Sequence, residues 1–203
     1  RNIFEKLASS EKYSPVPVFV MKDGDSHRLF QIPINLLLKD NADDIRDKIL
    51  KNVHHPVIDE IKSNLLQMTD TYSGADTIFD AVEITYESLK ENVAAAFIAL
   101  HGRPGEDGEV QARLDRIGLP YNGCSAEASS VTINKFNTLQ KLRDHGFSVT
   151  DQLLLSKDDF ETDKSEFAKQ VESKMAYPFI AKPVDDGCSS AVKIIKNQRQ
   201  LLA

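Results

Sequence analysis

The sequence predicts an α/β protein with a mostly parallel sheet. Segments with helical and strand-like patterns alternate through most of the 203 residues. The apolar run at 93–100, Val-Ala-Ala-Ala-Phe-Ile-Ala-Leu, is typical of a strand that is buried on both faces, as strands of parallel sheets are. A glycine-rich loop and a helical pattern follow this run. Together these observations indicate strand–helix–strand connectivity.

The elements before this run have weaker patterns. Residues 2–9 carry apolar side chains at helical spacing and are predicted to form an amphipathic helix. A short strand is predicted at 16–21 and a turn at Asp23-Gly24. Residues 28–38 are expected to contain a short strand followed by a turn of helix.

Residues 39–72 place apolar side chains in steps of four, which predicts one apolar stripe along a helical face. Pro56 interrupts the stripe, so the segment is either two short helices or one kinked helix. Residues 78–92 also have a helical pattern. The stripe of the longer segment consists of Ile45, Ile49, Val53, Val57, Ile61 and Leu65.

The part after the apolar run again alternates helix and strand. A helix at 108–117 is expected to end at Gly118, because glycine favours the left-handed conformation that closes helices. A short strand is expected to start within 119–123. The remaining predictions are a helix at 129–144, a strand at 152–156, a helix at 164–175, strands at 177–182 and 191–195, and a helix from 198.

Composition excludes several classes of protein. Hydrophobic residues make up 41% and charged residues 28%, as in ordinary globular proteins. No apolar run reaches the roughly 18 residues of a membrane helix. A net charge of −6 argues against a nucleic-acid partner. Cys124 and Cys188 form no disulfide framework or zinc pattern, which fits a reducing cytoplasm.

Lys182 and the polar loop after it are the first candidate site. Gly187 allows the backbone to approach a ligand, and consecutive N–H groups can hold phosphate oxygens. Ser189 and Ser190 add hydroxyl donors, and lysine suits phosphate as a compact charge. A β-hairpin with a polar turn and a surface lysine explains the same spacing, since a single glycine loop is weak support.

The loop from His101 to Gly108 is the second candidate. It follows the predicted buried strand and opens a helix, and ligands of α/β proteins bind at that end of a strand. A helix N-terminus also favours an anionic group. The alternative is that Glu106 and Asp107 only cap the helix, but capping leaves His101 unexplained.

Other candidates are weaker on their own. Lys135 is an ordinary surface lysine by its immediate neighbours. The adjacent His54 and His55 point in different directions on a helix and lack partners at ligand spacing, which indicates solvated side chains. Cys188 lies in a polar loop, but no local histidine signature supports a catalytic thiol.

In order and spacing, four motifs across residues 93–196 resemble the D-alanine–D-alanine ligase family, which belongs to the ATP-grasp enzymes. The family patterns are H-G-x-x-G-E-D-G, G-I-P-Y-x-G, an M-D-K-like triplet, and P-x-x-x-K-P followed by G-S-S-V-G. They correspond here to His101, Gly102, Gly105, Glu106, Asp107 and Gly108; to 118–123; to Ile133-Asn134-Lys135; and to 178–183 with 187–191.

The resemblance implies two domains. Residues 1–123 would form an N-terminal Rossmann-like, pre-ATP-grasp domain with a parallel sheet, and residues 124–203 an incomplete α+β ATP-grasp subdomain. Residues 39–92 look like a family-variable insertion. The family's first strand would precede Arg1, and the second half of the ATP-grasp fold would follow Ala203. The resemblance therefore predicts an N-terminal portion of a longer ligase, inactive by itself.

The resemblance also implies a function, namely ATP-dependent ligation of two D-alanines through an acyl phosphate, in peptidoglycan precursor synthesis for the cell wall. The cofactors would be ATP and Mg²⁺, with the Mg²⁺ ligands beyond residue 203. The protein would be cytoplasmic, would act on small amino acids and is a possible homodimer through its N-terminal domain.

The implied roles fall on few residues. Lys135 and Lys182 would contact the ATP phosphates, and Ile180 would line the adenine side of the cleft. The loop with Gly187, Cys188 and Ser189 would close over the transferred phosphate and the substrate. His101 and Glu106 would lie near the first substrate.

Three departures from the family pattern bear on specificity. Cys188 replaces a serine of the substrate-side hydrogen-bonding network, and a thiol is a weaker donor. Ser190-Ala191 replaces Val-Gly, and Asn134 replaces aspartate. These changes leave open another amino or hydroxy acid as substrate, a catalytically silent relative that binds ATP or a partner, or an α/β binding module that shares only the fold.

Overall fold

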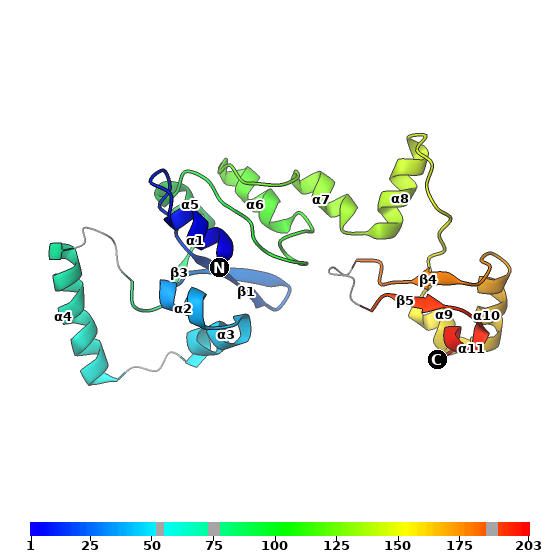
Figure 1. Cartoon of the computed structure of the whole chain (residues 1–203), viewed down its shortest axis with the longest axis horizontal. Coiled ribbons are helices and arrows are strands. Elements are labelled where there is room, and N and C mark those ends of the chain that lie inside the picture. The colour runs from blue at the N-terminus through cyan, green and yellow to red at the C-terminus, as the bar shows by residue number, and fades with distance from the viewer. Residues whose placement is uncertain (52–54, 73–77, 186–190) are drawn as a thin grey trace. The chain divides into compact units, whose positions relative to one another are not determined.

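The computed structural model describes residues 1–51, 55–72, 78–185 and 191–203, with the side chains of 66–72 left aside. The chain divides into two compact units, Arg1–Val93 and Ala94–Ala203. Figure 1 labels their helices and strands. Each unit mixes helices with a small sheet, so the predicted combination of helix and strand is confirmed.

The sheet of the first unit contains β1 (Val18–Asp23), β2 (Ser26–Gln31) and β3 (Val82–Ile84), in the order β1-β2-β3. Both pairings are antiparallel. Gly24-Asp25 forms the turn between β1 and β2, with Gly24 at φ 60°. So short a turn joins only antiparallel neighbours, because a parallel pair needs a long crossover. The predicted mostly parallel sheet is therefore wrong for the described strands.

Apolar side chains of this sheet and of α3 form the core of the first unit. Met21, Phe30, Ile32 and Ile45 are all buried and form one cluster. The helices beside the sheet are α2 (Ile34–Lys39) and α3 (Ala42–Lys51), and Leu36, Leu37 and Ile49 pack against the cluster. The stripe that the sequence predicted at Ile45 and Ile49 thus faces the core.

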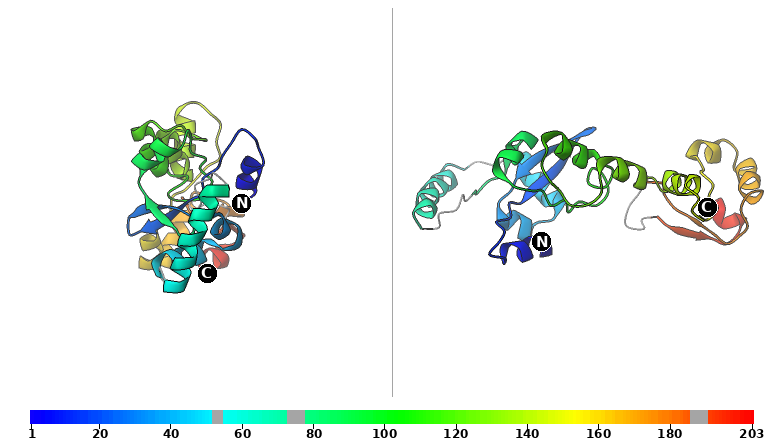
Figure 2. Two further views of the ribbon diagram at one scale, coloured as in Figure 1. Left: turned by 90° about the vertical axis from the view of Figure 1, so that its left-hand side faces the viewer. Right: turned by 90° about the horizontal axis from the view of Figure 1, so that it is seen from above.

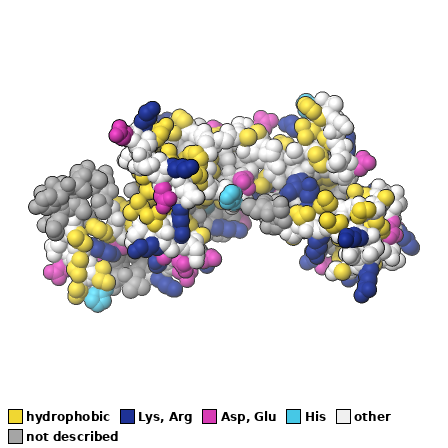
Figure 3. Space-filling view, viewed as in Figure 1, with side chains coloured by type: hydrophobic (Ala, Val, Ile, Leu, Met, Phe, Trp, Pro, Cys, Tyr) yellow, Lys and Arg dark blue, Asp and Glu magenta, His cyan; other side chains and the backbone are white. Residues whose placement is uncertain are grey.

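The remaining helices of the first unit are α1 (Asn2–Ala8), α4 (Pro56–Tyr72) and α5 (Tyr86–Asn92). Separate helices α3 and α4 agree with the two-helix alternative. The stripe residues Val57 and Ile61 of α4 are exposed, and hydrophobic side chains are visible on this helix at the left of Figure 3.

The helix predicted at 78–92 is only half right. The helix α5 begins after Thr85, whose hydroxyl accepts a hydrogen bond from the backbone N–H of Ser88 while the Ser88 hydroxyl accepts one from Thr85 N–H. This capping box sets the start of the helix. Residues 82–84 are left outside it and pair with β2 as β3.

The apolar run at 93–100 forms no buried strand. Ala96 makes a single parallel bridge to Tyr121, with Ala96 N–H donating to Pro120 O at 2.8 Å. The side-chain amide of Asn122 pairs with both backbone groups of Ile98, and Phe97 is exposed. A buried strand needs a ladder and covered faces. Here a side chain replaces the ladder, so the prediction is wrong.

The second unit continues with α6 (Glu109–Ile117), which ends at Gly118 with φ 65°, as predicted. The helix predicted at 129–144 is instead α7 (Ala126–Thr132) and α8 (Lys135–Asp144). The break occurs because the Asn134 side chain accepts a hydrogen bond from Asn137 N–H at 2.9 Å and starts a new helix.

No strand forms at 152–156. Ser156 instead caps α9 (Lys157–Thr162), an element that the sequence pattern did not predict. The unit ends with α10 (Lys164–Glu172), β4 (Phe179–Ala181), β5 (Lys193–Ile195) and α11 (Gln198–Leu201), close to the predicted positions. The strands β4 and β5 pair antiparallel, with α9 and α10 lying close to this hairpin in the views of Figures 1 and 2.

Candidate functional site

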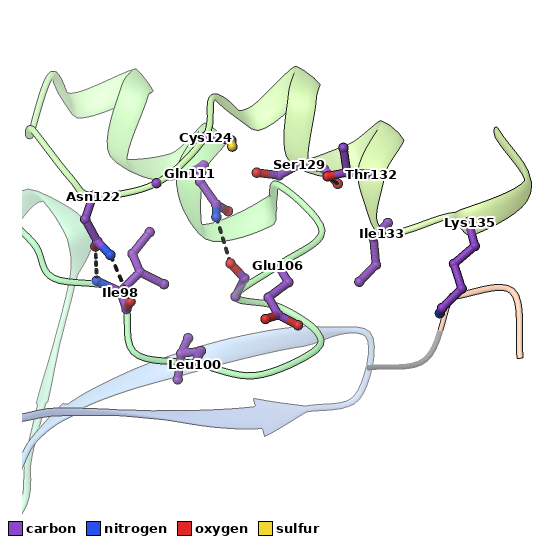
Figure 4. Close-up of a pocket in the computed structure, with 12 residues that line it drawn as sticks. Ile98, Leu100, Glu106, Gln111, Asn122, Cys124, Ser129, Thr132, Ile133 and Lys135 are labelled. Atoms are coloured by element: carbon purple, nitrogen blue, oxygen red, sulfur yellow. Dashed lines mark hydrogen bonds between the residues drawn. The ribbon is translucent and has the colours of Figure 1, made fainter. Parts of the chain in front are cut away.

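A cavity of about 470 Å³ lies within the second unit (Figure 4). It brings together Glu106, predicted to lie near the first substrate, and Lys135, predicted to contact phosphate. Its walls come from the segments before and within the glycine-rich loop, from α6, from the 122–124 turn and from α7 and α8. The lining residues are Ile98, Leu100, Gly105, Glu106, Gln111, Asn122, Gly123, Cys124, Ser129, Thr132, Ile133 and Lys135.

Glu106 is anchored within its own loop. One carboxylate oxygen accepts a hydrogen bond from Gly102 N–H at 2.6 Å, while Glu106 N–H donates to Gly102 O at 2.8 Å. Its other oxygen lies 3.8 Å from Nδ1 of the exposed His101. Glu106 therefore closes the turn of its own loop and does not cap α6, whereas Asp107 accepts a hydrogen bond from Glu109 N–H at the start of that helix. Glu106 also keeps one oxygen beside the histidine, where a ligand has access to both groups.

Steric constraints explain why glycine occupies several positions of this loop. Gly102 and Gly108 have φ values of 68° and 93°, which residues with a Cβ rarely adopt. A Cβ on Gly105 would overlap the Leu100 side chain, and one on Gly108 would overlap the backbone of Ala126. The glycine spacing thus brings the backbone close to its neighbours and shapes one wall of the cavity.

Gln111 is a residue of the cavity wall that the sequence reasoning missed. It is buried on α6, and its Nε2 donates a hydrogen bond to Gly105 O at 2.7 Å (Figure 4). Among the described atoms, its Oε1 is buried without a hydrogen-bond partner. The signal in the sequence was a polar residue between Val110 and Leu114 on the apolar face of α6.

Arg103 connects this loop to the segment after β4. Its guanidinium donates to Asp107 Oδ2 and to Asp185 Oδ2, at 3.1 Å in each case. The hydrogen bond to Asp185, together with the charges of both carboxylates, raises the pKa of Arg103. Lys135 N–H donates to Val184 O at 2.8 Å. The loop after Lys182 therefore contacts two other segments that carry predicted site residues.

The two strands that this loop connects, β4 and β5, carry a pair of exposed apolar side chains. Ile180 is directly opposite Ile194 across β4 and β5, and the two residues are 62% and 61% exposed. Lys182 follows Ile180 by two positions, which places them on the same side of an extended chain. Ile194 was missed because only the strand register reveals it as the partner of Ile180.

Several predicted residues lie outside the described part of the chain, namely Gly187, Cys188, Ser189 and Ser190 of the predicted phosphate loop and, elsewhere, Val53 and His54. Among the residues that are described, no group of three or more His, Cys, Asp or Glu side chains is placed to hold a metal ion. Cys124 has a free, exposed thiol. Within the described ranges, no helix has the length and apolarity to cross a membrane.

Curated D-alanine–D-alanine ligases are similar to much of this chain. The enzyme of Chlorobium phaeobacteroides is 27% identical over 195 residues, which cover 93% of this chain and 48% of the relative. The enzyme of Pelodictyon phaeoclathratiforme is 34% identical over 111 residues, covering 55% of this chain and 31% of the relative. The chain thus spans less than half the length of these two relatives.

A solved structure shares the fold along nearly the whole chain. The D-Ala:D-Ser ligase of Enterococcus faecalis superposes with a TM-score of 0.59 at 20% identity, over 98% of this chain and 50% of the other. At that identity the likeness concerns the fold alone.

Family models match both parts of the sequence. The model described as D-ala D-ala ligase N-terminus matches residues 1–124, and the model described as D-ala D-ala ligase C-terminus matches residues 139–203. Because the first match alone spans more than half of the chain, the chain belongs to the D-alanine–D-alanine ligase family.

Proposed function

We propose that the protein is an ATP-dependent carboxylate–amine ligase that joins two D-alanines for peptidoglycan precursor synthesis. The first carboxylate would be phosphorylated to an acyl phosphate, which the amine of the second amino acid attacks. The observation that carries the proposal is the cavity shared by Glu106 and Lys135, one suited to an amino acid and the other to a phosphate. Membership of the ligase family supports the same reaction.

The nucleotide would lie along the outer face of the β4–β5 hairpin. Ile180 and Ile194 offer exposed apolar surface to an adenine ring, and Lys182 follows at the end of β4. Lys135 begins α8, which is hydrogen-bonded to the loop after Lys182. The two lysine ammonium groups suit the phosphates of a nucleoside triphosphate, and the apolar pair suits its base. The described residues alone do not fit a Mg²⁺ site, so the proposal assigns phosphate binding within this chain to the lysines.

The first amino acid would bind beside the His101–Gly108 loop. The Glu106 carboxylate can accept hydrogen bonds from an ammonium group, and it is held in place by Gly102 N–H. An acyl phosphate must be protected from water. We assign that protection to the loop with Gly187, Cys188 and Ser189. A thiol at position 188 is a weaker hydrogen-bond donor than a hydroxyl, so this position bears on which amino acid is bound.

The proposal includes a division at residues 123 and 124, with a pre-ATP-grasp domain before it and the first ATP-grasp subdomain after it. The first family model ends at residue 124 and supports this boundary. The compact units divide elsewhere, between Val93 and Ala94. A cytoplasmic location and a homodimer formed through residues 1–123 are further parts of the proposal and rest on family membership.

The test is phosphate release by the complete gene product in the presence of ATP, Mg²⁺ and one amino acid at a time. We expect D-alanine to raise release above the blank without amino acid. Release with D-serine or D-lactate added to D-alanine, but not with D-alanine alone, would reassign the second substrate. ATP binding without release for any of these compounds would favour a catalytically silent relative.

A further inference from the structure

We propose that Arg103 is a positioning residue that ties the loop after β4 to the His101–Gly108 loop and thereby sets the affinity for ATP. The inference rests on the proposed function, because it places the ATP phosphates beside Lys182 and the described residues that follow it, 183–185. It adds a residue to which neither the motif spacing nor the resemblance gave a role.

One end of this tie is rigid. Asp107 has a side chain that is only 10% exposed, and its Oδ2 accepts the hydrogen bond from Arg103. Its Oδ1 accepts another from Glu109 N–H at 3.1 Å, at the start of α6. With both oxygens occupied, the carboxylate fixes the direction of the guanidinium and leaves its second nitrogen to face another segment.

The other end is the segment that carries the predicted phosphate contacts. Asp185 accepts the hydrogen bond from Arg103 across 82 positions of sequence. Its neighbour Val184 accepts the backbone hydrogen bond from Lys135. Lys182 lies three residues before Asp185. Arg103 and the start of α8 therefore hold the same short segment, and each contact restricts where the two lysines stand relative to Glu106.

The chemistry of the contact requires arginine. One guanidinium uses two different nitrogens for two carboxylates, which a lysine ammonium on a flexible stem does not reproduce. The tie also neutralises Asp185, which is otherwise a negative charge near the proposed phosphate site. Without Arg103, ATP would have to bind beside a bare carboxylate.

The tie has little effect on folding. Arg103 and Asp185 have side chains that are 57% and 47% exposed, and exposed ion pairs contribute little to stability. We therefore expect the loss of this ion pair to weaken nucleotide binding and to leave the stability of the fold nearly unchanged. Couplings of exposed pairs correspond to changes of about two- to fivefold in an equilibrium constant.

The experiment compares Arg103→Ala, Arg103→Lys, Asp185→Asn and the double variant Arg103→Ala/Asp185→Asn in the complete gene product. KM for ATP and kcat are measured by phosphate release at saturating amino acid, and ATP affinity by calorimetry. Arg103→Ala and Arg103→Lys are each expected to raise KM for ATP about two- to fivefold with kcat within about twofold, and Asp185→Asn is expected to raise it less, because it breaks the contact without leaving a bare carboxylate. The double variant is expected to have a KM for ATP no higher than that of Arg103→Ala, because both changes remove the same Arg103–Asp185 contact.

Arg46→Ala is the matched control. Arg46 is 51% exposed, and its guanidinium also lies near two carboxylates, those of Asp43 and Asp47 on α3, in the other unit. Its KM for ATP should equal that of the wild type. Arg103 variants that behave like Arg46→Ala, or single effects that multiply in the double variant, would overturn the inference while wild-type turnover upholds the ligase. A wild type that neither binds nor hydrolyses ATP would overturn both.

Discussion

Two antiparallel strand pairs in the described part of the chain, β1–β2 and β4–β5, use their apolar side chains in opposite ways. In the first unit, Phe30 and Met21 of β2 and β1 are buried in the core beside α2 and α3. In the second unit, Ile180 and Ile194 of β4 and β5 face outward. Exposed apolar side chains that are adjacent to one another are a feature of binding surfaces. The comparison separates a sheet that stabilises its unit from a hairpin with a face suited to a ligand.

The segments that connect the strands of the two hairpins also differ, one being a tight turn and the other a long loop. The turn at Gly24-Asp25 joins β1 and β2 directly and fixes their register. Residues 182–192 join β4 and β5, and the described start of that connection is held by Lys135 and Arg103 instead of by a tight turn. A short turn determines strand pairing, whereas a long connection can supply side chains and N–H groups to a ligand.

Phe30→Ala should give the largest effect on stability. The change leaves a cavity in the core of the first unit, for which losses of about 3–5 kcal/mol are typical. Urea unfolding of the 203-residue chain measures the loss. Ile194→Ala is the control from the other hairpin and should lose less than about 1 kcal/mol, since it removes exposed surface. Equal losses for the two variants would contradict the comparison.

Lys182→Ala should give the largest effect on function. If Lys182 contacts the ATP phosphates as proposed, removing its charge is expected to reduce kcat/KM by about 100-fold or more. Phosphate release by the complete gene product measures this. Lys157→Ala is the control, because Lys157 is an exposed lysine whose partner is Glu161 on the same helix. A Lys182→Ala variant with the activity of the wild type would remove Lys182 from the site.

Gln111→Leu should have a smaller effect, both on stability and on binding of the amino acid. Leucine fills the space but leaves Gly105 O without its hydrogen bond, at a cost on the order of 1 kcal/mol. We also expect a higher KM for the amino acid, because Gly105 supports the turn that holds Glu106. Gln170→Leu on the exposed side of α10 serves as the control. An unchanged KM would show that the loop keeps its shape without Gln111.

Glu83→Gln should give the smallest effect, one that is present near neutral pH and disappears in acid. The hydrogen bond from Arg28, 2.7 Å long, lowers the pKa of Glu83 in the folded protein. The stabilisation by this pair is therefore complete above the unfolded pKa of about 4.3 and is lost as the pH falls through the folded value. Melting temperatures of wild type and variant should differ near neutral pH and converge in acid. A constant difference would contradict this assignment.

Local chemistry made part of the fold predictable. Gly118 ends α6 where the sequence indicated, and Asp23-Gly24 marks the turn between β1 and β2. These features depend on glycine backbone preferences and on neighbouring residues. Predictions based on hydrophobic runs were less successful. The run at 93–100 and the segment at 152–156 were expected to be strands, but a strand also requires a partner that the run itself does not specify.

The sequence by itself determined the order and spacing of the family motifs, and with them the membership that the family models show. Only the tertiary structure decided that Gln111 supports Gly105, that Arg103 reaches Asp185, and that Ile194 stands opposite Ile180. The physical reason is distance along the chain. Motif spacing and helix ends follow from adjacent residues, whereas these contacts join residues that become neighbours only when the backbone has folded.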